Sequence, residues 1–218
     1  MEPEQKKINI LFLDFDGTIV DSNKIKDQAF DKIFSRWPQF RDCMMEWHLK
    51  HNALDRYKKF EFFVNEILND STNESLLNDL VAEFEDMTEK AIINCSYILG
   101  AFEFMNELSK YIPIYLLSAT PHLNLLNIIN KREISNIFNG IYGAPINKRE
   151  IIQALIFQNK ISEDEVLYIG DSQEDLDVAT SLKINFILRK SDRKIKENNY
   201  PRFNDFNQIK DYYHKKFI

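Results

Sequence analysis

The sequence has few of the residues that build disulfide-rich or zinc-stabilised proteins. Its 218 residues include two cysteines, Cys43 and Cys95, which form no CxxC pair. This spacing supports neither a disulfide scaffold nor a zinc site. We therefore expect both cysteines to be buried free thiols. The sequence also contains no internal repeat and no low-complexity linker.

Long apolar runs are absent as well. No window approaches the roughly 18 apolar residues that a membrane-spanning helix requires. The first residues, MEPEQKKIN, are polar and contain no apolar stretch of signal-peptide length. These absences favour a protein of the reducing cytoplasm that has no membrane partner.

The chain lacks an excess of positive charge. Its 28 Lys and Arg residues are outnumbered by 34 Asp and Glu residues, and the formal net charge is −6. We therefore expect no nucleic-acid partner, whereas metal ions are favoured. Hydrophobic content of 44% and charged content of 28% are typical of a soluble globular protein. The length fits one large domain, or a core domain that carries a smaller inserted one.

Five apolar runs have the length and composition of buried strands, and amphipathic segments separate them. These runs are Ile8–Asp14, Ile112–Ser118, Gly140–Gly143, Val166–Gly170 and Ile184–Leu188. Strands that alternate with helices predict an α/β fold with a parallel sheet covered on both faces. From Lys190 onward we expect a last edge strand and a short helix.

The stretch between the first two predicted strands is far longer than a crossover helix needs, and its pattern is helical. Ser22 can cap a first helix, a second helical pattern covers Tyr57–Leu68, and a third begins near Ser71. We predict that residues 22–95 form a helical insertion. It would lie over the carboxyl ends of the strands, where ligands bind in open α/β sheets.

The first strand ends in the sequence LFLDFDGTIVDS, which places two carboxylates at its carboxyl end. Asp14 and Asp16 are two residues apart, so they share one face and leave the strand together. Gly17 and Thr18 then indicate a tight turn that supports this site.

Other predicted strands end in polar residues that would meet these aspartates. The segment LLSAT offers Ser118, the backbone amide of Ala119 and Thr120, and GDSQED offers Asp171 and Asp175. If a helix starts at once, Asp171 and Asp175 share a face, whereas Asp177 is expected in solvent. Asn147 can cap a helix whose first turn contains Lys148, a position that favours a bound anion nearby.

Phosphoryl transfer needs each of these groups. It requires a nucleophile, a divalent cation, donors to the phosphoryl oxygens and a proton donor for the leaving group. Asp14 can be both nucleophile and Mg²⁺ ligand, and Asp171 completes an oxygen-rich metal site. Ser118, the Ala119 amide and Lys148 would hold the phosphoryl oxygens, and Asp16 would act as general acid and base.

In order and in strand context, DFDGT, LLSAT, the isolated Lys148 and GDSQED resemble the four motifs of the haloacid dehalogenase-like hydrolase superfamily. The long insertion resembles the C1 cap of subfamily I, as in phosphoglycolate-phosphatase-like and β-phosphoglucomutase-like members. The resemblance spans about residues 8–189. It implies a three-layer, Rossmann-like core (residues 1–21 and 96–218) with a parallel sheet, and an inserted all-helical cap (residues 22–95).

The resemblance also implies roles for single residues. Asp14 would form an aspartyl-phosphate and bind Mg²⁺, to which Asp171 and the main-chain carbonyl of Asp16 would also bind. Ser118 and Lys148 would bind the phosphoryl group, and Asp175 would support the site.

An Asp at position 16 favours a phosphatase for a small organic phosphomonoester, because members that dehalogenate or cleave carbon–phosphorus bonds carry another residue there. The alternatives are a β-phosphoglucomutase-like phosphomutase and a non-enzymatic phospho-receiver switch. A monomer or weak homodimer is expected.

The predicted insertion contains candidates for substrate choice in HNALDRYKKF. Asp55 can cap a helix that carries Arg56 and Lys59 on one face, with Tyr57, Phe60 and Val64 directed inward. Either the two basic residues bind the leaving group, or they lie in solvent. His48 and His51 are three apart, but with no third ligand nearby we expect them on a solvated face.

Overall fold

The computed structural model describes residues 7–51, 54–196 and 199–218. In this part of the chain, six parallel strands form one sheet in the order β3-β2-β1-β4-β5-β6. The strands are β1 Ile10–Asp14, β2 Ile114–Pro121, β3 Gly140–Ala144, β4 Val166–Gly170, β5 Asn185–Arg189 and β6 Arg202–Phe203.

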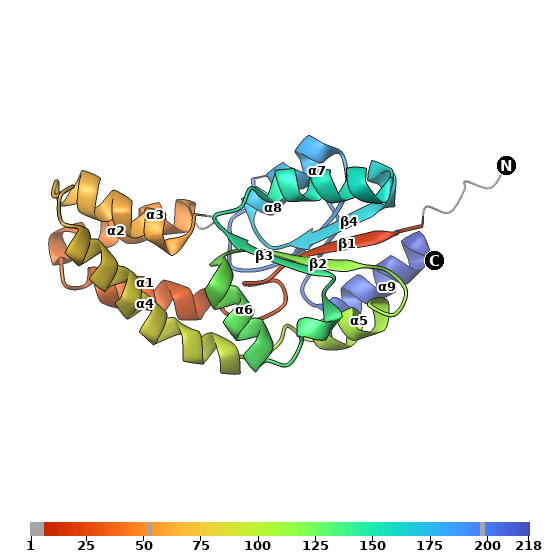
Figure 1. Ribbon diagram of the computed structural model, residues 1–218, viewed down its shortest axis with the longest axis horizontal. Coiled ribbons are helices and arrows are strands. Elements are labelled where there is room, and N and C mark those ends of the chain that lie inside the picture. The colour runs from red at the N-terminus through yellow and green to blue at the C-terminus, as the bar shows by residue number, and fades with distance from the viewer. Residues whose placement is uncertain (1–6, 52–53, 197–198) are drawn as a thin grey trace.

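Helices cover both faces of the sheet and give the three-layer arrangement (Figure 1). On one face lie α5 Ala101–Leu108, α6 His122–Lys131 and α9 Phe206–Phe217; on the other lie α7 Lys148–Asn159 and α8 Gln173–Leu182. Successive residues of β1 enter opposite cores: Leu11 and Leu13 pack toward α5, and Ile10 and Phe12 pack toward α7 and α8. Because side chains alternate between the two faces of a strand, β1 contributes to the hydrophobic cores on both faces of the sheet.

The strand order places β1 at the centre of the sheet. From β1 the chain continues to β2 and β3 on one side and then crosses to β4 and β5 on the other. Such a reversal opens a crevice at the carboxyl ends of the central strands. Asp14 is the last residue of β1 and therefore lies at this crevice.

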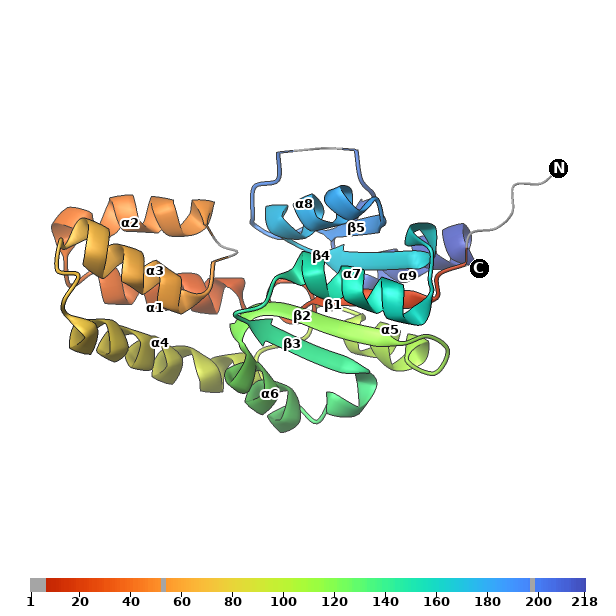
Figure 2. The ribbon, with the colours of Figure 1, turned by 45° about the horizontal axis from the view of Figure 1, so that its top comes forward.

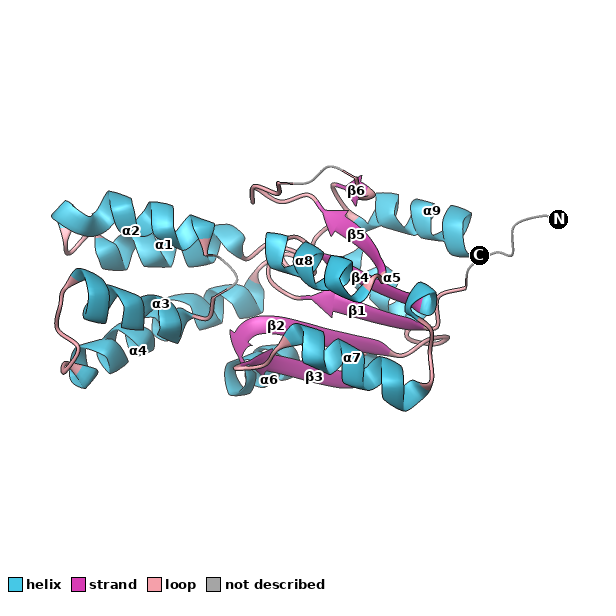
Figure 3. Ribbon diagram, turned by 90° about the horizontal axis from the view of Figure 1, so that it is seen from above, coloured by secondary structure: helices cyan, strands magenta, loops and turns pink. Residues whose placement is uncertain are grey.

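Of the described helices between β1 and β2, the four that precede α5 extend beyond the carboxyl ends of the strands (Figures 1 and 2). They are α1 Asn23–Phe34, α2 Pro38–Lys50, α3 Arg56–Phe62 and α4 Glu74–Asn94, and a π-helical turn, Phe63–Ile67, follows α3. We call them the helical insert. Seen from above, they group at one end of the sheet (Figure 3). Stacked and tilted aromatic rings, including those of Phe30, Phe34, Phe60 and Phe84, form a core of their own.

The insert joins the sheet region through two chain segments that lie side by side. Val20 and Tyr97 form an antiparallel bridge, and the Asp21 amide donates to the Ser96 carbonyl at 3.0 Å. Arg132 of α6 adds a clamp, because its guanidinium donates to the carbonyls of Ile92, Ile93 and Cys95 at the end of α4.

All predicted strands are present, with ends that differ by a few residues, and the predicted edge strand and final helix are β6 and α9. The helix predicted near Ser71 begins at Glu74, where Asn73 caps it. Helix α2 has no counterpart among the helices named from the sequence. The predicted helix Tyr57–Leu68 is α3 followed by the π-helical turn.

Three local predictions were wrong. Cys43 is exposed, because it lies on the outer side of α2. Cys95 is half-buried. Tyr57 is 45% exposed, whereas Phe60 and Val64 point inward as predicted. Ser22 precedes α1, but its hydroxyl donates to Asp16 and makes no capping hydrogen bond. Among the described residues, no helix is long and apolar enough to cross a membrane.

Candidate active site

The turn after β1 brings the two leading aspartates to the crevice. Gly17 has a φ of +74°, and a Cβ at this position would come within 2.2 Å of side-chain atoms of Asn23 and Asp171. Glycine thus permits both the left-handed turn and the close approach of these groups. Thr18 is buried, and its hydroxyl donates to Asp14 at 3.3 Å.

Three buried carboxylates meet at the ends of β1 and β4. One oxygen from each of Asp14, Asp171 and Asp175 lies within 4.8 Å of the others. Burial raises the pKa of Asp14 well above its ordinary value, and the charges of Asp175 and Asp171 raise it further. Burial, followed by the charge of Asp175, raises the pKa of Asp171 to about 6. Burying three acids this close together is unfavourable unless cations compensate them.

Lys148 supplies one of these cations. As predicted, Asn147 caps α7 and Lys148 occupies the first turn of the helix, where its side chain is only 5% exposed. Its ammonium lies 3.0 Å from Asp14 and 2.7 Å from Asp175. Burial lowers the pKa of Lys148, but Asp14 and Asp175 outweigh that effect and raise it well above its ordinary value. The ammonium therefore stays charged.

Asp175 differs from the other two acids because its oxygens already accept several hydrogen bonds. One oxygen accepts from Lys148 and the Tyr168 hydroxyl, and the other accepts from the amide and the hydroxyl of Ser172. These donors, with Lys148 foremost, hold the pKa of Asp175 below its ordinary value although burial raises it. Asp175 thus orients Lys148, and its lone pairs are occupied.

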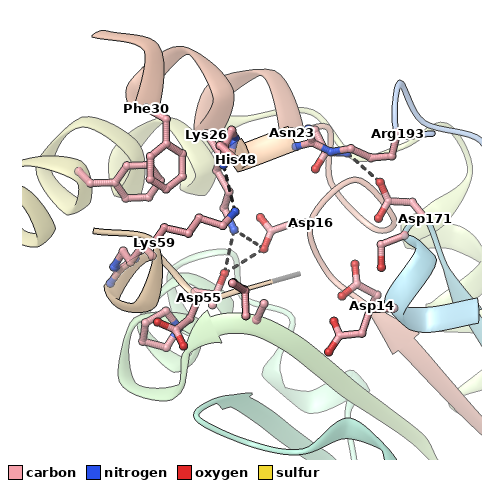
Figure 4. Close-up of a pocket in the computed structure, with 18 of the residues that line it drawn as sticks. Asp14, Asp16, Asn23, Lys26, Phe30, His48, Asp55, Lys59, Asp171 and Arg193 are labelled. Carbon is pink, nitrogen blue, oxygen red and sulfur yellow. Dashed lines mark hydrogen bonds and ion pairs between the residues drawn. The ribbon is translucent and has the colours of Figure 1, made fainter. Parts of the chain in front are cut away.

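Asp14 and Asp171 keep the capacity to bind a divalent cation. Asp14 accepts one bond from Lys148 and a longer one from Thr18, and Asp171 accepts from the Asn23 amide at 2.7 Å. Both carboxylates face the same side of the pocket in Figure 4. Hard divalent cations prefer such a set of carboxylate oxygens. The residues present therefore fit a divalent metal.

Asp16 lies in a second environment, on the side of the helical insert. It accepts from the Ser22 hydroxyl at 2.7 Å and the Thr120 hydroxyl at 2.9 Å, and it pairs with the Lys26 ammonium at 2.5 Å. Burial raises its pKa, but the charge and the hydrogen bonds of Lys26 outweigh burial and lower it. The Asp16 carboxylate is therefore ionised in this arrangement.

The end of β2 adds polar groups to the same pocket. Ser118 is buried, its hydroxyl accepts from the Thr120 amide at 3.0 Å, and it lies 3.4 Å from Asp16. Ala119 and Thr120 line the pocket beside Asp14. The structure thus brings together Asp14, Asp16, Ser118, Ala119, Lys148, Asp171 and Asp175, all named from the sequence.

Arg56 and Lys59 line the other wall of this pocket. Asp55 caps α3 as predicted, and its carboxylate accepts from the Lys58 amide. The Arg56 guanidinium donates to Glu85 of α4 and to Asn124 of α6, while its Nε is buried and makes no hydrogen bond among the described residues. Lys59 is 3% exposed. Both basic residues therefore face the pocket.

We predicted that His48 lies on a solvated face, and this prediction was wrong. The residue is 2% exposed, lines the pocket, and binds Asp27 and Lys59, because Asp27 and the Phe30 ring cover it. His51 is exposed, and so is Asp177, as expected. Segment 52–53 of the predicted specificity stretch lies outside the described residues.

Comparison with protein families assigns the fold and the site to one group. The haloacid dehalogenase-like hydrolase family matches residues 10–189, which include β1 through β5 and every motif described above. The chain belongs to this family. None of the curated proteins matches it.

Solved structures of such hydrolases share the fold of this family member. A putative haloacid dehalogenase-like hydrolase from Bacteroides fragilis is 20% identical with a TM-score of 0.70, covering 93% of this chain and 100% of that one. A predicted phosphoglycolate phosphatase from Haemophilus somnus is 14% identical with a TM-score of 0.71 (94% and 97%). A CbbY mutant from Rhodobacter sphaeroides, in complex with xylulose-(1,5)bisphosphate, is 13% identical with a TM-score of 0.71 (93% and 96%).

Several residues of the hydrolase's pocket were not identified from the sequence. Lys26 and Asn23 contact the predicted aspartates directly, and Arg193 lines the same pocket from the segment after β5. A signal existed for the first two, since Asn23 and Lys26 are three apart and lie on one face of the first predicted helix. No local pattern distinguishes Arg193 from other basic residues.

The raised pKa of Asp171 predicts a pH-dependent gain in stability when its charge is removed. A carboxyl whose pKa is higher in the folded than in the unfolded protein destabilises the fold as the pH rises from about 4 to about 6, and the penalty persists above that range. In metal-free buffer, Asp171→Asn should therefore raise the free energy of unfolding by ~1–3 kcal/mol at pH 7.5 and by much less at pH 4.5.

Urea denaturation in EDTA at the two pH values measures this difference. Asp177→Asn is the matched control, because Asp177 is exposed on α8, the helix that follows Asp171, and its substitution should change the stability little at either pH. A loss of stability for Asp171→Asn at pH 7.5 would contradict the electrostatic account.

Proposed function

We propose that the protein is a Mg²⁺-dependent phosphatase that hydrolyses a small organic phosphomonoester through an aspartyl-phosphate on Asp14. One observation carries the proposal: at the end of the central strand, Asp14 lies between the Lys148 ammonium and the metal-competent Asp171, and Asp16 follows two residues later. The CbbY structure supports the substrate class, since its complex contains a phosphorylated small molecule.

Asp14 and Asp171 would hold Mg²⁺, with the main-chain carbonyl of Asp16 as a further ligand. When bound, the cation neutralises charge on the phosphoryl oxygens and on the clustered carboxylates. Asp175 would support the metal site without binding the cation, because its oxygens already accept hydrogen bonds from Lys148, Tyr168 and Ser172.

Asp14 provides the nucleophile. One carboxylate oxygen attacks phosphorus, the bond from phosphorus to the ester oxygen breaks, and the leaving alkoxide takes up a proton. Lys148, the Ser118 hydroxyl and the Ala119 amide would donate to the phosphoryl oxygens, where negative charge accumulates in the transition state. Lys148 is held in place for this by Asp175 at 2.7 Å.

Asp16 would transfer the protons. It has to be protonated to serve the leaving alkoxide, and negative charge on an arriving phosphoryl group raises the pKa of a neighbouring carboxyl. After the alkoxide leaves, the Asp16 carboxylate takes a proton from water, which attacks phosphorus and regenerates Asp14. Lys26, at 2.5 Å, orients Asp16 in both steps.

The helical insert would select the leaving group. Arg56 and Lys59 line the same pocket as Asp14, and Arg56 Nε is a buried donor that makes no hydrogen bond among the described residues. A planar guanidinium suits carboxylates and vicinal hydroxyls.

The first test is metal dependence. Release of phosphate from a panel of phosphorylated metabolites should stop in excess EDTA and return with Mg²⁺, because Asp14, Asp171 and phosphoryl oxygens repel one another without a cation. Ca²⁺ should inhibit, since its larger coordination sphere holds the nucleophile in the wrong geometry. Solvent ¹⁸O should enter the released phosphate. Undiminished turnover in EDTA, or an isomeric phosphate ester as the main product, would reject the phosphatase in favour of other chemistry.

The second test separates the two leading aspartates. Asp14→Asn should abolish hydrolysis because the nucleophile is lost, and Asp16→Asn should slow turnover by at least ~10²-fold because proton transfer is lost. Asp21→Asn is the control, since Asp21 is exposed in the same segment and should retain activity. Full activity in folded Asp14→Asn would show that no aspartyl-phosphate forms there.

The third test concerns Arg56. Arg56→Ala should lower kcat/KM for the best metabolite by roughly 10- to 100-fold and leave hydrolysis of p-nitrophenyl phosphate nearly unchanged. Glu85→Gln removes the partner in the ion pair but keeps the guanidinium, so it should preserve substrate preference. Equal losses on both substrates for Arg56→Ala would assign Arg56 to the fold instead.

A further inference from the structure

A buried tyrosine hydroxyl lies at the far end of the hydrogen bonds that lead to Lys148. Tyr168 is the third residue of β4 and is fully buried. Its ring packs in the core between the sheet and α7 and α8, edge-on to Phe186 with the ring centroids 5.9 Å apart. Its hydroxyl donates to Oδ1 of Asp175 in the first turn of α8. A phenylalanine would fill the same space without burying a polar group, so packing alone does not account for the hydroxyl.

The backbone at the end of β4 permits this contact. Gly170 is two residues after Tyr168 and therefore lies on the same face of the strand. A Cβ at Gly170 would come within 2.6 Å of three side-chain atoms of Asp175. The glycine thus leaves room for Asp175 to lie against the strand, within reach of the Tyr168 hydroxyl.

The charges fix the direction of each hydrogen bond at Asp175. Burial, followed by the charge of Asp175, raises the pKa of Tyr168 well above its ordinary value, so the hydroxyl keeps its proton. An ionised carboxylate only accepts, so Oδ1 of Asp175 accepts from both the Tyr168 hydroxyl and the Lys148 ammonium. The amide and the hydroxyl of Ser172 donate to the other oxygen. Both oxygens are therefore held, and the orientation of the carboxylate is fixed.

Asp175 in turn fixes the position of the Lys148 ammonium. An ammonium has three N–H donors, and in the described part of the chain two of them bind Asp175 and Asp14, at 2.7 and 3.0 Å. The Glu174 carboxylate is farther from the ammonium, at 3.6 Å. One donor thus remains for a ligand oxygen beside Asp14. Without the Tyr168 hydroxyl, Oδ1 of Asp175 would be held by Lys148 alone, and the carboxylate and the ammonium would shift together.

We infer that Tyr168 is a positioning residue of the active site, whose hydroxyl holds the Lys148 ammonium at the phosphoryl group through Asp175. The inference rests on the proposed function, which places the phosphoryl group at Asp14. Tyr168 itself is not among the residues that line the pocket, so its effect passes through one intervening carboxylate. Positioned donors act most strongly where negative charge accumulates in the transition state. Loss of the hydroxyl should therefore weaken binding of a transition-state analogue and slow turnover.

Tyrosine-to-phenylalanine variants separate the hydroxyl from the ring. Orthovanadate is the probe, because pentacoordinate vanadate imitates phosphorus during in-line displacement. Calorimetric titration in Mg²⁺ should show that Tyr168→Phe binds vanadate roughly 5- to 50-fold more weakly than the wild type, with unchanged stoichiometry. The kcat for p-nitrophenyl phosphate should fall by a similar factor.

Tyr115→Phe is the matched control. Tyr115 of β2 packs against the same core, with its ring stacked on Phe12, and its hydroxyl is not part of the hydrogen bonds that lead to Lys148. The vanadate affinity and the kcat of this variant should stay within about twofold of the wild type. Equal losses for the two variants would overturn the inference.

A double-mutant cycle tests whether the effect passes through Lys148. Lys148→Met should weaken vanadate binding more than Tyr168→Phe does, and adding Tyr168→Phe to it should weaken binding no further, because both act on one contact. Additive losses would show that the hydroxyl acts independently of the ammonium and would overturn the inference. Circular dichroism checks that each variant is folded. If Lys148→Met does not fold, the comparison of Tyr168→Phe with Tyr115→Phe decides alone.

The remaining outcomes separate this inference from the proposed function. Wild-type vanadate affinity in Tyr168→Phe, or a wild-type protein that does not bind vanadate, would overturn the inference even if phosphate esters are hydrolysed. A lower stoichiometry at unchanged affinity would assign the hydroxyl to the fold and overturn it as well. A vanadate affinity that depends on the hydroxyl, in a protein that releases no phosphate from any ester, would support the positioning role and reject the phosphatase.

Discussion

The contact between the Lys148 ammonium and the carboxylates of Asp14 and Asp175 is the interaction on which the rest of the site depends. It joins the central strand to α7 and α8 and compensates acids that burial would otherwise neutralise. The donors that surround Asp175 hold that carboxylate and thereby the lysine. Because this cation is fixed, Asp14 and Asp171 can remain close together and still be available to a metal.

Charge of opposite sign holds the helical insert against the sheet. In the sheet region, Asp16 binds Lys26 of α1 and Asp171 binds Asn23 of α1. In a third pair the acid belongs to the insert, because Arg193 of the sheet region binds Asp27 of α1. Helix α4 is tied to α6 separately by Arg132. The same side chains thus close the pocket and set its polarity. The orientation of the insert and the chemistry of the site therefore depend on the same charged groups.

The sequence predicted the features that arise from local periodicity and from order along the chain. Short apolar runs predicted the strands, and because the carboxyl ends of parallel strands lie at one edge of a sheet, Asp14, Ser118 and Asp171 were expected to meet there. Features that depend on distant partners were missed. His48 is buried because Asp27 and Phe30 cover it and Arg193 neutralises Asp27, and no pattern near His48 contains that information. Tyr57 was placed inward by helical spacing alone, although the insert core was already filled by phenylalanines.

The paired segments that connect the insert have an evolutionary consequence. Val20 and Tyr97 bridge directly, so the chain leaves the sheet and returns to it at one point. A segment whose ends lie side by side can be lengthened, shortened or exchanged without altering the register of any strand. Most of the groups proposed for hydrolysis lie in the sheet region and those proposed to select the leaving group lie in the insert, so a recombination event at this junction can change the substrate, provided that the new insert supplies counterparts of Asn23 and Lys26.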